Sequence, residues 1–221
     1  MNTELIHIYF VPGLAASKEI FRNISMDSNH YRVHIIDWLI PKKKESLEDY
    51  AKRMAAHVDQ GPAVLVGVSF GGVVAQEMSR YLTLKKLLII SSVKTRHELP
   101  RRMRLAKKTK AYKLLPTGWA LSIKDLTKLA IGPKSKRRLK LYQEYLWVRD
   151  KVYLDWAIEN MICWQREEAL ADVIHIHGDL DPVFPIRYIR DPRVVKDGTH
   201  IMILNKGSKI SKLLDNILSQ P

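Results

Sequence analysis

One short segment limits what this chain can fold into more than any other: the apolar run Ala63–Val68, which leads into Gly67-Val68-Ser69-Phe70-Gly71-Gly72. A nearly unbroken apolar run is typical of a strand covered on both faces, as the central strands of a parallel sheet are. The glycines allow a sharp turn directly after this strand, and a helical pattern follows from about Gly72 to Tyr81. The segment therefore predicts a buried strand, a tight turn and a helix.

The remainder of the chain repeats this alternation. Helices are predicted after Ser46, which stands three positions before Asp49 as in a capping box, and over about Lys209–Leu218. Alternating strands and helices favour an α/β fold with a doubly wound, mostly parallel sheet of about six strands. If the second strand lies outside the first, the winding reverses between the first and third strands, where open sheets bind ligands. The other strands are predicted at Leu5–Val11, Arg32–Ile36, Leu87–Ile90, Val173–His177 and Arg193–Val195.

The stretch from residue 100 to residue 165 interrupts the alternation, because it has helical patterns and no strand pattern. It also holds most of the charge. Fifteen Lys and Arg against three acids between residues 101 and 150 give +12 of the formal net charge of +14. We interpret residues 100–165 as a helical, basic lid insertion over one end of the sheet. Residues 1–99 and 166–221 then form one core, which suits a chain of 221 residues.

Ser69 is the predicted nucleophile. In the pattern G-x-S-x-G between a strand and a helix, the serine occupies a strained turn that exposes its hydroxyl. Gly67 and Gly71 are required there, because a side chain at either position would collide with the tight turn. The helix that follows directs its positive end at the site and stabilises an anion that forms during a reaction. An ordinary glycine-rich turn with a capping serine is the alternative.

A serine hydroxyl needs a neighbouring base, and His200 is the best placed of the eight histidines. It follows Asp197-Gly198-Thr199, just beyond the last predicted strand and at the end of the sheet where the predicted nucleophile lies. The base needs a carboxylate that fixes its tautomer and stabilises the imidazolium. Asp181 is preferred, because Asp179 stands nearer the preceding strand, where the chain has not yet turned toward the base. Glu98 is a third candidate.

Taken together, these motifs resemble the α/β-hydrolase fold family, whose triad has the same order of serine, acid and histidine along the chain. The resemblance implies that the backbone N–H groups of Leu14 and Phe70 form an oxyanion hole. It also implies that the usual N-terminal hairpin of the family is missing. The stretches similar to the acid loop, the histidine loop and the loop after the first conserved strand are His177-Gly-x-x-Asp181-x-x-x-Pro185, Gly198-x-His200 and Phe10-Val-Pro12-Gly13-Leu14.

Such a site predicts a serine hydrolase that cleaves an ester or thioester of a small or acyl-chain substrate through a covalent acyl-enzyme. Acyl transfer and carbon–carbon bond cleavage stay open, because the same triad supports them. A second class of function is also open, in which a non-catalytic protein keeps the fold and docks an acidic partner through the basic insertion.

The basic residues of the insertion are the candidates for such docking. Solvated faces of amphipathic helices are the common fate of such charge. The alternative is attraction of an acidic carrier protein, a coenzyme A thioester or an anionic lipid surface. Nucleic acid is disfavoured, because the cations are not interleaved with aromatic residues on which bases could stack. The docking candidates are Arg101, Arg102, Arg104, Arg137 and Arg138.

Other classes of protein are disfavoured by composition. The single cysteine, Cys163, cannot form an intramolecular disulfide. His175, His177 and Asp179 begin an H-x-H-x-D metal motif that lacks the further histidines of a binuclear site, so neither a metal nor a cofactor is expected. No apolar run approaches the roughly 20 residues that span a bilayer, and no signal-peptide pattern opens the chain. We therefore expect a cytoplasmic protein.

Overall fold

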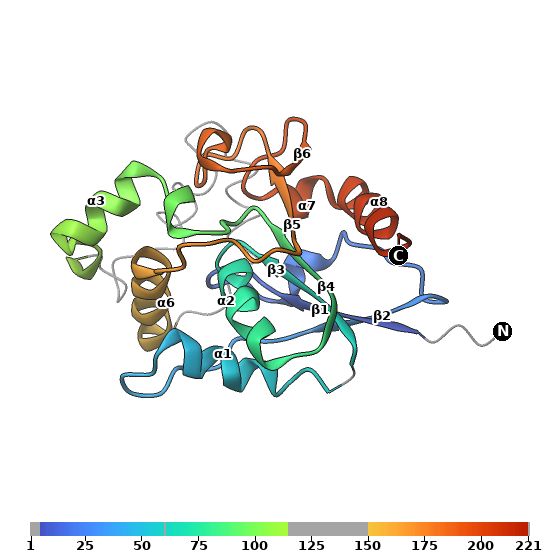
Figure 1. Ribbon diagram of the computed structural model, residues 1–221, viewed down its shortest axis with the longest axis horizontal. Coiled ribbons are helices and arrows are strands. Elements are labelled where there is room, and N and C mark those ends of the chain that lie inside the picture. The colour runs from blue at the N-terminus through green and yellow to red at the C-terminus, as the bar shows by residue number, and fades with distance from the viewer. Residues whose placement is uncertain (1–4, 60, 115–149, 221) are drawn as a thin grey trace.

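The computed structural model describes residues 5–59, 61–114 and 150–220, which form one sheet with helices on both faces (Figure 1). The sheet has six strands in the order β2-β1-β3-β4-β5-β6, and all neighbouring strands are parallel. This confirms the predicted doubly wound α/β fold, with the reversal of winding between β1 and β3. The strands are β1 (Ile6–Val11), β2 (Tyr31–Ile35), β3 (Ala63–Val68), β4 (Leu84–Ile90), β5 (Val173–Gly178) and β6 (Arg193–Val195).

Helices connect the strands, and several are single turns. The α-helices of the described ranges are α1 (Leu47–Ala55), α2 (Phe70–Met78), α3 (Arg101–Thr109), α6 (Lys151–Cys163), α7 (Met202–Asn205) and α8 (Gly207–Leu218). The short 3₁₀ helices are η1 (Lys18–Phe21), η2 (Ser79–Tyr81), η3 (Arg96–Glu98), η4 (Ala111–Leu114) and η5 (Ile186–Tyr188).

All six predicted strands are present, and most of their bounds agree with the prediction to within one residue. β3 and β6 have the predicted bounds, whereas β4 begins three residues early because its start, including the exposed Lys85, extends past the covered part of the sheet. α2 begins at Phe70, because the turn before it is tight enough for that residue to be helical already. Ser46 caps α1 by accepting from the amide of Asp49, and its hydroxyl donates to the Asp49 carboxylate at 2.6 Å.

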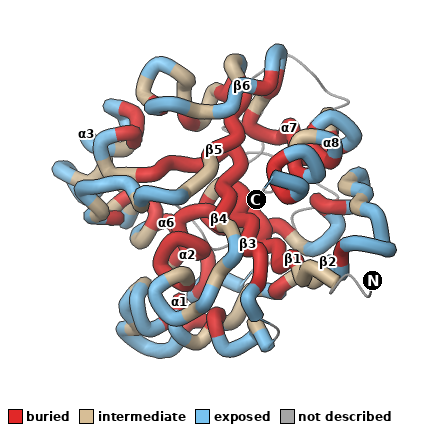
Figure 2. Tube along the Cα trace, turned by 45° about the vertical axis from the view of Figure 1, so that its right-hand side comes forward, coloured by how far each residue is buried: buried red, intermediate tan, exposed pale blue. Residues whose placement is uncertain are grey.

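The two faces of the sheet contribute to separate apolar clusters. Tyr9 and Leu65 point into the cluster that contains α1, α2 and α6. Ile8 and Val64, one position away on the same strands, point into the cluster that contains α7 and α8. All of β3 is buried, and buried backbone runs through the middle of the sheet in Figure 2. The apolar run of β3 thus reflects a strand covered from both sides.

The basic insertion is described in part, as α3, η4 and α6. Residues 115–149, with Arg137 and Arg138, lie outside the described residues. α6 places Tyr153, Leu154 and Ala157 in the cluster shared with α1 and α2. The division at residue 165 therefore stays a prediction. Within the described ranges, no helix combines the length and the apolar character needed to cross a membrane.

The start of α2 lies directly against the end of β1. A methyl group added to Gly71 would be 2.2 Å from the carbonyl oxygen of Pro12 and 2.5 Å from that of Val11. At Gly67 an added methyl would meet the backbone of α2 at 2.3 Å. Both neighbours are backbone and cannot rotate away, so the turn after β3 requires glycine on each side.

This contact predicts that Gly71→Ala lowers the free energy of unfolding by about 3 kcal/mol or more, because the methyl group must separate two buried backbone segments. Gly13→Ala is the control, since its methyl would have ordinary contacts of 3.6 and 3.7 Å. Urea denaturation of both variants measures the difference. Equal, small losses would show that the strand and helix can move apart.

Two buried histidines lie side by side on β5. His177 Nε2 is 2.8 Å from the carbonyl of Phe184, so this nitrogen carries the proton and donates. His177 Nδ1 then accepts from His175 Nε2 at 3.1 Å. Burial lowers the pKa of both histidines, and the neighbouring His177 and Lys94 lower that of His175 further. Both rings are therefore neutral in the folded protein near neutral pH.

Stability should fall as the pH decreases from 7 to 5. The unfolded chain binds protons below the ordinary histidine pKa of about 6.5, whereas the buried neutral rings do not. Each histidine contributes at most about 2 kcal/mol to the loss at pH 5. His175→Gln should flatten this slope in urea titrations at several pH values. An unchanged slope in His175→Gln would contradict the neutral state of this buried ring.

Candidate active site

Ser69 joins β3 to α2 in a conformation that few residues with a side chain adopt. Its φ is 54° and its ψ is −120°. Its N–H donates to the carbonyl of Ile90 at 2.9 Å, and its own carbonyl accepts from the hydroxyl of Ser92 at 2.7 Å. The end of β4 and the second residue after it thus hold the strained turn in place, and the Ser69 side chain is left half-buried.

The structure brings Ser69, His200 and Asp181 into one chain of hydrogen bonds, although Ser69 and His200 are 131 positions apart. His200 Nε2 is 2.9 Å from Ser69 Oγ, and His200 Nδ1 is 2.9 Å from Asp181 Oδ2. Because an ionised carboxylate only accepts, Nδ1 carries the proton and Nε2 offers its lone pair to the serine hydroxyl. This arrangement allows His200 to take the proton of Ser69.

Asp181 is buried, yet its charge is well compensated. Oδ1 accepts from the amides of Val183 at 2.7 Å and Phe184 at 2.9 Å, while Oδ2 faces His200. Burial alone would raise the pKa of Asp181, but the charge and hydrogen bond of His200, the nearby His177 and the Phe184 amide lower it below its ordinary value. The carboxylate is therefore ionised at neutral pH, as an acceptor for a histidine N–H must be.

The two other candidate acids are placed elsewhere. Glu98 is buried and accepts from the amides of Lys94 and Arg190, and burial raises its pKa. It therefore joins the loop after β4 to the loop before β6. Asp179 stands just after β5, and it is Asp181 that lies against His200.

The loops that carry Asp181 and His200 are joined to each other. The amide of Leu180 donates to the carbonyl of Gly198 at 2.9 Å, and the amide of Gly198 donates to Val195 at 3.0 Å. A methyl group on Gly178 would lie 2.2 Å from the Gly198 carbonyl oxygen. The backbones after β5 and β6 therefore touch, and the acid and the base are held by one pair of interlocked turns.

Two residues that the sequence did not single out for this role support the acid loop. His177, at the end of β5, donates to the Phe184 carbonyl and lies 3.6 Å from Asp181 Oδ2. Arg102 of α3 donates to the carbonyls of Pro182 and Val183, each at 2.8 Å. Arg102 is thus bonded to the acid loop, and α3 lies beside the site. The sequence indicated His177 as the start of the acid-loop stretch and Arg102 as a docking candidate, but it did not predict these contacts.

The predicted oxyanion residues are Phe70, which follows Ser69 in the chain, and Leu14, in a loop that approaches Ser69. Phe70 is the first residue of α2, where a backbone N–H has no partner within the helix. Leu14 lies in the loop after β1, next to Gly13, and a methyl group on Gly13 would be 3.6 Å from the Cβ atom of Ser69. Both residues therefore border the nucleophile.

The other docking candidates that the structure describes and the histidines of the metal motif lie outside the hydrogen-bonded chain of Ser69, His200 and Asp181. Arg101 and Arg104 are exposed on α3, whereas Arg137 and Arg138 fall outside the part of the chain that the structure describes. His175 and His177 bond to each other. Across the described residues, no group of three or more His, Cys, Asp or Glu side chains could hold a metal ion.

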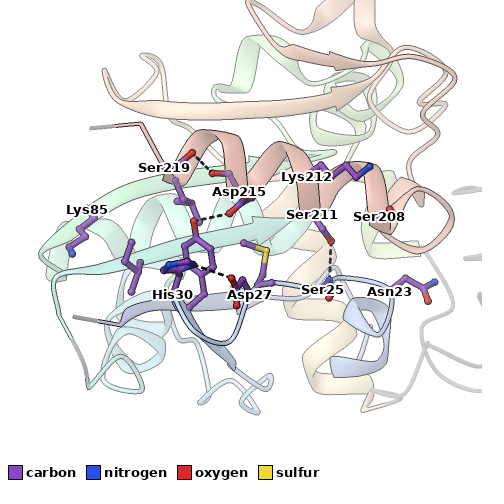
Figure 3. A pocket seen from close by; sticks show the side chains of 14 residues that line it. Asn23, Ser25, Asp27, His30, Lys85, Ser208, Ser211, Lys212, Asp215 and Ser219 are labelled. Atoms are coloured by element: carbon purple, nitrogen blue, oxygen red, sulfur yellow. Dashed lines mark hydrogen bonds and ion pairs between the residues drawn. The ribbon is translucent and has the colours of Figure 1, made fainter. Parts of the chain in front are cut away.

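A cavity of about 960 Å³ lies at the amino ends of the strands, between α8 and the starts of β1, β2 and β4 (Figure 3). Its polar groups bond to one another: His30 lies 3.1 Å from Asp27, and Tyr31 donates to Asp215 at 3.0 Å. The cavity shares no lining residue with the Ser69 site, which lies at the carboxyl ends of the strands, where open α/β sheets bind ligands.

Solved structures share the fold at low sequence identity. A hydrolase from Oleispira antarctica has a TM-score of 0.75 at 13% identity, over 98% of this chain and 92% of that one. An esterase from Thermogutta terrifontis has a TM-score of 0.73 at 14% identity, over 96% of this chain and 89% of that one. A carboxylesterase structure from the thaumarchaeon Nitrososphaera gargenis has a TM-score of 0.69 at 15% identity, over 98% of this chain and 91% of that one.

No curated protein matches the sequence. Residues 8–207, however, match the family described as the alpha/beta hydrolase family, and this range covers most of the chain. The six parallel strands and the placement of Ser69 after β3 agree with that match. The chain therefore belongs to the alpha/beta hydrolase family.

Proposed function

We propose that the protein is a serine hydrolase that cleaves an ester or thioester of a small or acyl-chain substrate. The observation that carries the proposal is the continuous hydrogen-bonded chain from Ser69 through His200 to Asp181. Membership of the alpha/beta hydrolase family supports a hydrolase. Structural similarity to an esterase from Thermogutta terrifontis is consistent with an ester as substrate.

The reaction would proceed in two halves. Ser69 Oγ attacks the acyl carbon while His200 Nε2 takes the hydroxyl proton, and Asp181 stabilises the imidazolium. The amides of Leu14 and Phe70 donate to the oxyanion. His200 then returns the proton to the departing alcohol or thiol, and an ester of Ser69 remains. In the second half, His200 removes a proton from water, the hydroxide attacks the acyl carbon, and Ser69 leaves with the proton.

The surroundings of the base favour this chemistry. The ring of Phe184 packs edge-on against His200, with ring centroids 5.4 Å apart, and His200 is buried. A base in such surroundings forms stronger electrostatic contacts than it would in water. The two amides on Asp181 Oδ1 keep the carboxylate in place when His200 becomes charged.

We expect Ser69→Ala to abolish labelling by a fluorophosphonate probe. His200→Ala and Asp181→Asn should lower kcat/KM for a short p-nitrophenyl ester by about a thousandfold or more, because each breaks the proton path. Asp179→Asn is the matched control for Asp181→Asn and should retain most activity. Equal labelling of wild type and Ser69→Ala, or folded wild-type protein without labelling or turnover, would contradict a serine hydrolase and favour a binding role.

We further propose that the basic surface beside the acid loop attracts an anionic part of the substrate or of its carrier. The guanidinium group of Arg187 of η5 lies 5.0 Å from the ring centroid of Tyr188, and the charges of Arg101 and Arg104 of α3 act on the same phenol. The hydrogen bond from Arg187 and the charges of all three guanidinium groups lower the pKa of that phenol. The same helix contacts the acid loop through Arg102. An acyl group on coenzyme A or an acidic carrier would be drawn toward Ser69 by this field.

The double variant Arg101→Glu/Arg104→Glu should lower kcat/KM for an acyl-coenzyme A thioester about tenfold or more at low salt, and should change that for a neutral p-nitrophenyl ester less than about twofold. Lys209→Glu/Lys212→Glu on α8 changes the net charge equally and is the control. An equal effect of the α3 variant on both substrates, or equal effects of both variants, would refute local attraction.

A further inference from the structure

Trp38, in the loop after β2, contacts both sides of the proposed oxyanion hole. Its indole Nε1–H donates to the carbonyl oxygen of Gly13 at 3.0 Å. Its ring lies nearly parallel to that of Phe70, with centroids 5.6 Å apart and an interplanar angle of 25°. One side chain thus joins the loop after β1 to the first residue of α2.

The bond to Gly13 fixes the direction of a second group. The carbonyl of Gly13 and the N–H of Leu14 belong to one planar trans peptide, so they point in opposite directions. A donor that holds the carbonyl on one side therefore holds the Leu14 N–H on the other. The Gly13 carbonyl has a second donor, the Ala16 amide at 3.0 Å, which belongs to the same short loop and moves with it. Trp38 is the donor that comes from a different loop.

Trp38 is itself held firmly. The Tyr50 hydroxyl donates to the carbonyl of Leu39 at 2.8 Å and accepts from its amide at 3.0 Å, which fixes the backbone next to the indole. The ring also packs against Tyr153, with centroids 5.4 Å apart, and against Tyr50 at 6.4 Å. Since Tyr50 and Tyr153 are fully buried, the indole is anchored to the core of the fold.

We propose that Trp38 is a positioning residue for the oxyanion hole, which sets the direction of the Leu14 N–H through its hydrogen bond to the Gly13 carbonyl. The inference rests on the proposed serine hydrolase activity. Without the indole N–H, the donor that remains on the Gly13 carbonyl among the described residues is the Ala16 amide of the same loop, and the Leu14 N–H loses its fixed direction. Substrate binding does not require that direction, whereas stabilisation of the oxyanion does.

The test is Trp38→Phe, which keeps an aromatic ring against Phe70 and removes the N–H. Trp156→Phe is the matched control. The Trp156 indole also donates to a backbone carbonyl, that of Glu45 at 2.8 Å, and its ring lies in the same aromatic cluster, 4.2 Å from that of Tyr50. Trp38→Phe should lower kcat for a p-nitrophenyl ester about tenfold with KM unchanged, a fraction of the loss from deleting an oxyanion donor. Trp156→Phe should stay within about twofold of wild type.

A second measurement separates the oxyanion hole from general packing. Affinity for a trifluoromethyl ketone, whose adduct with Ser69 bears an oxyanion, should fall by the same factor as kcat/KM in Trp38→Phe. If either phenylalanine variant fails to fold, the sulfur analogue of tryptophan, in which S replaces the indole N–H, preserves the shape at positions 38 and 156 and gives the same comparison.

The outcomes are distinguishable from those for the proposed function. Wild-type protein without Ser69-dependent turnover would overturn the proposed function itself. Ser69-dependent turnover with equal effects at positions 38 and 156, or a raised KM with kcat unchanged in Trp38→Phe, would overturn the positioning role, because the indole would then act through packing or through substrate contact.

Discussion

The contact between the start of α2 and the end of β1 is the constraint on which the site depends. It is a contact of backbone with backbone, at Gly71 and the carbonyls of Val11 and Pro12. Because β1 and β3 are neighbours in a parallel sheet, the loops at their carboxyl ends emerge side by side. The close approach then brings the loop after β1 against Ser69. The nucleophile and both proposed oxyanion donors thus occupy adjacent backbone.

A buried carboxylate would be costly without partners, and the acid loop supplies them. Asp181 accepts from two amides of its own loop and from His200. The loop is held in turn by His177 from the strand below and by Arg102 from α3. The described groups that bond to Asp181 are therefore held in place by their own loops, so little reorganisation accompanies a change of charge on His200.

Sequence patterns predicted the parts of the molecule that depend on local chemistry. The apolar run of β3 and the glycines around Ser69 indicated the strand, turn and helix, since a buried strand and a tight turn each need particular residue types. The four-residue helix α7 was not predicted, because one turn is too short to show a helical period. The contacts of Trp38 and Arg102 were not predicted, because both side chains bind backbone carbonyls, and every residue has a backbone carbonyl whatever its type.

The interlocked turns after β5 and β6 have a mechanical consequence. Because the Leu180 amide bonds to the Gly198 carbonyl and the two backbones touch at Gly178, Asp181 and His200 are carried by one bonded pair of turns. Ser69 is carried by β3, α2 and the end of β4, which are joined to β5 through the sheet. Of the two hydrogen bonds in the chain from serine to acid, the one between Asp181 and His200 therefore lies within one pair of turns, whereas the one between Ser69 and His200 spans two separately held segments. A small displacement of the paired turns relative to β3 would thus lengthen the bond to the nucleophile and leave the acid–base pair intact.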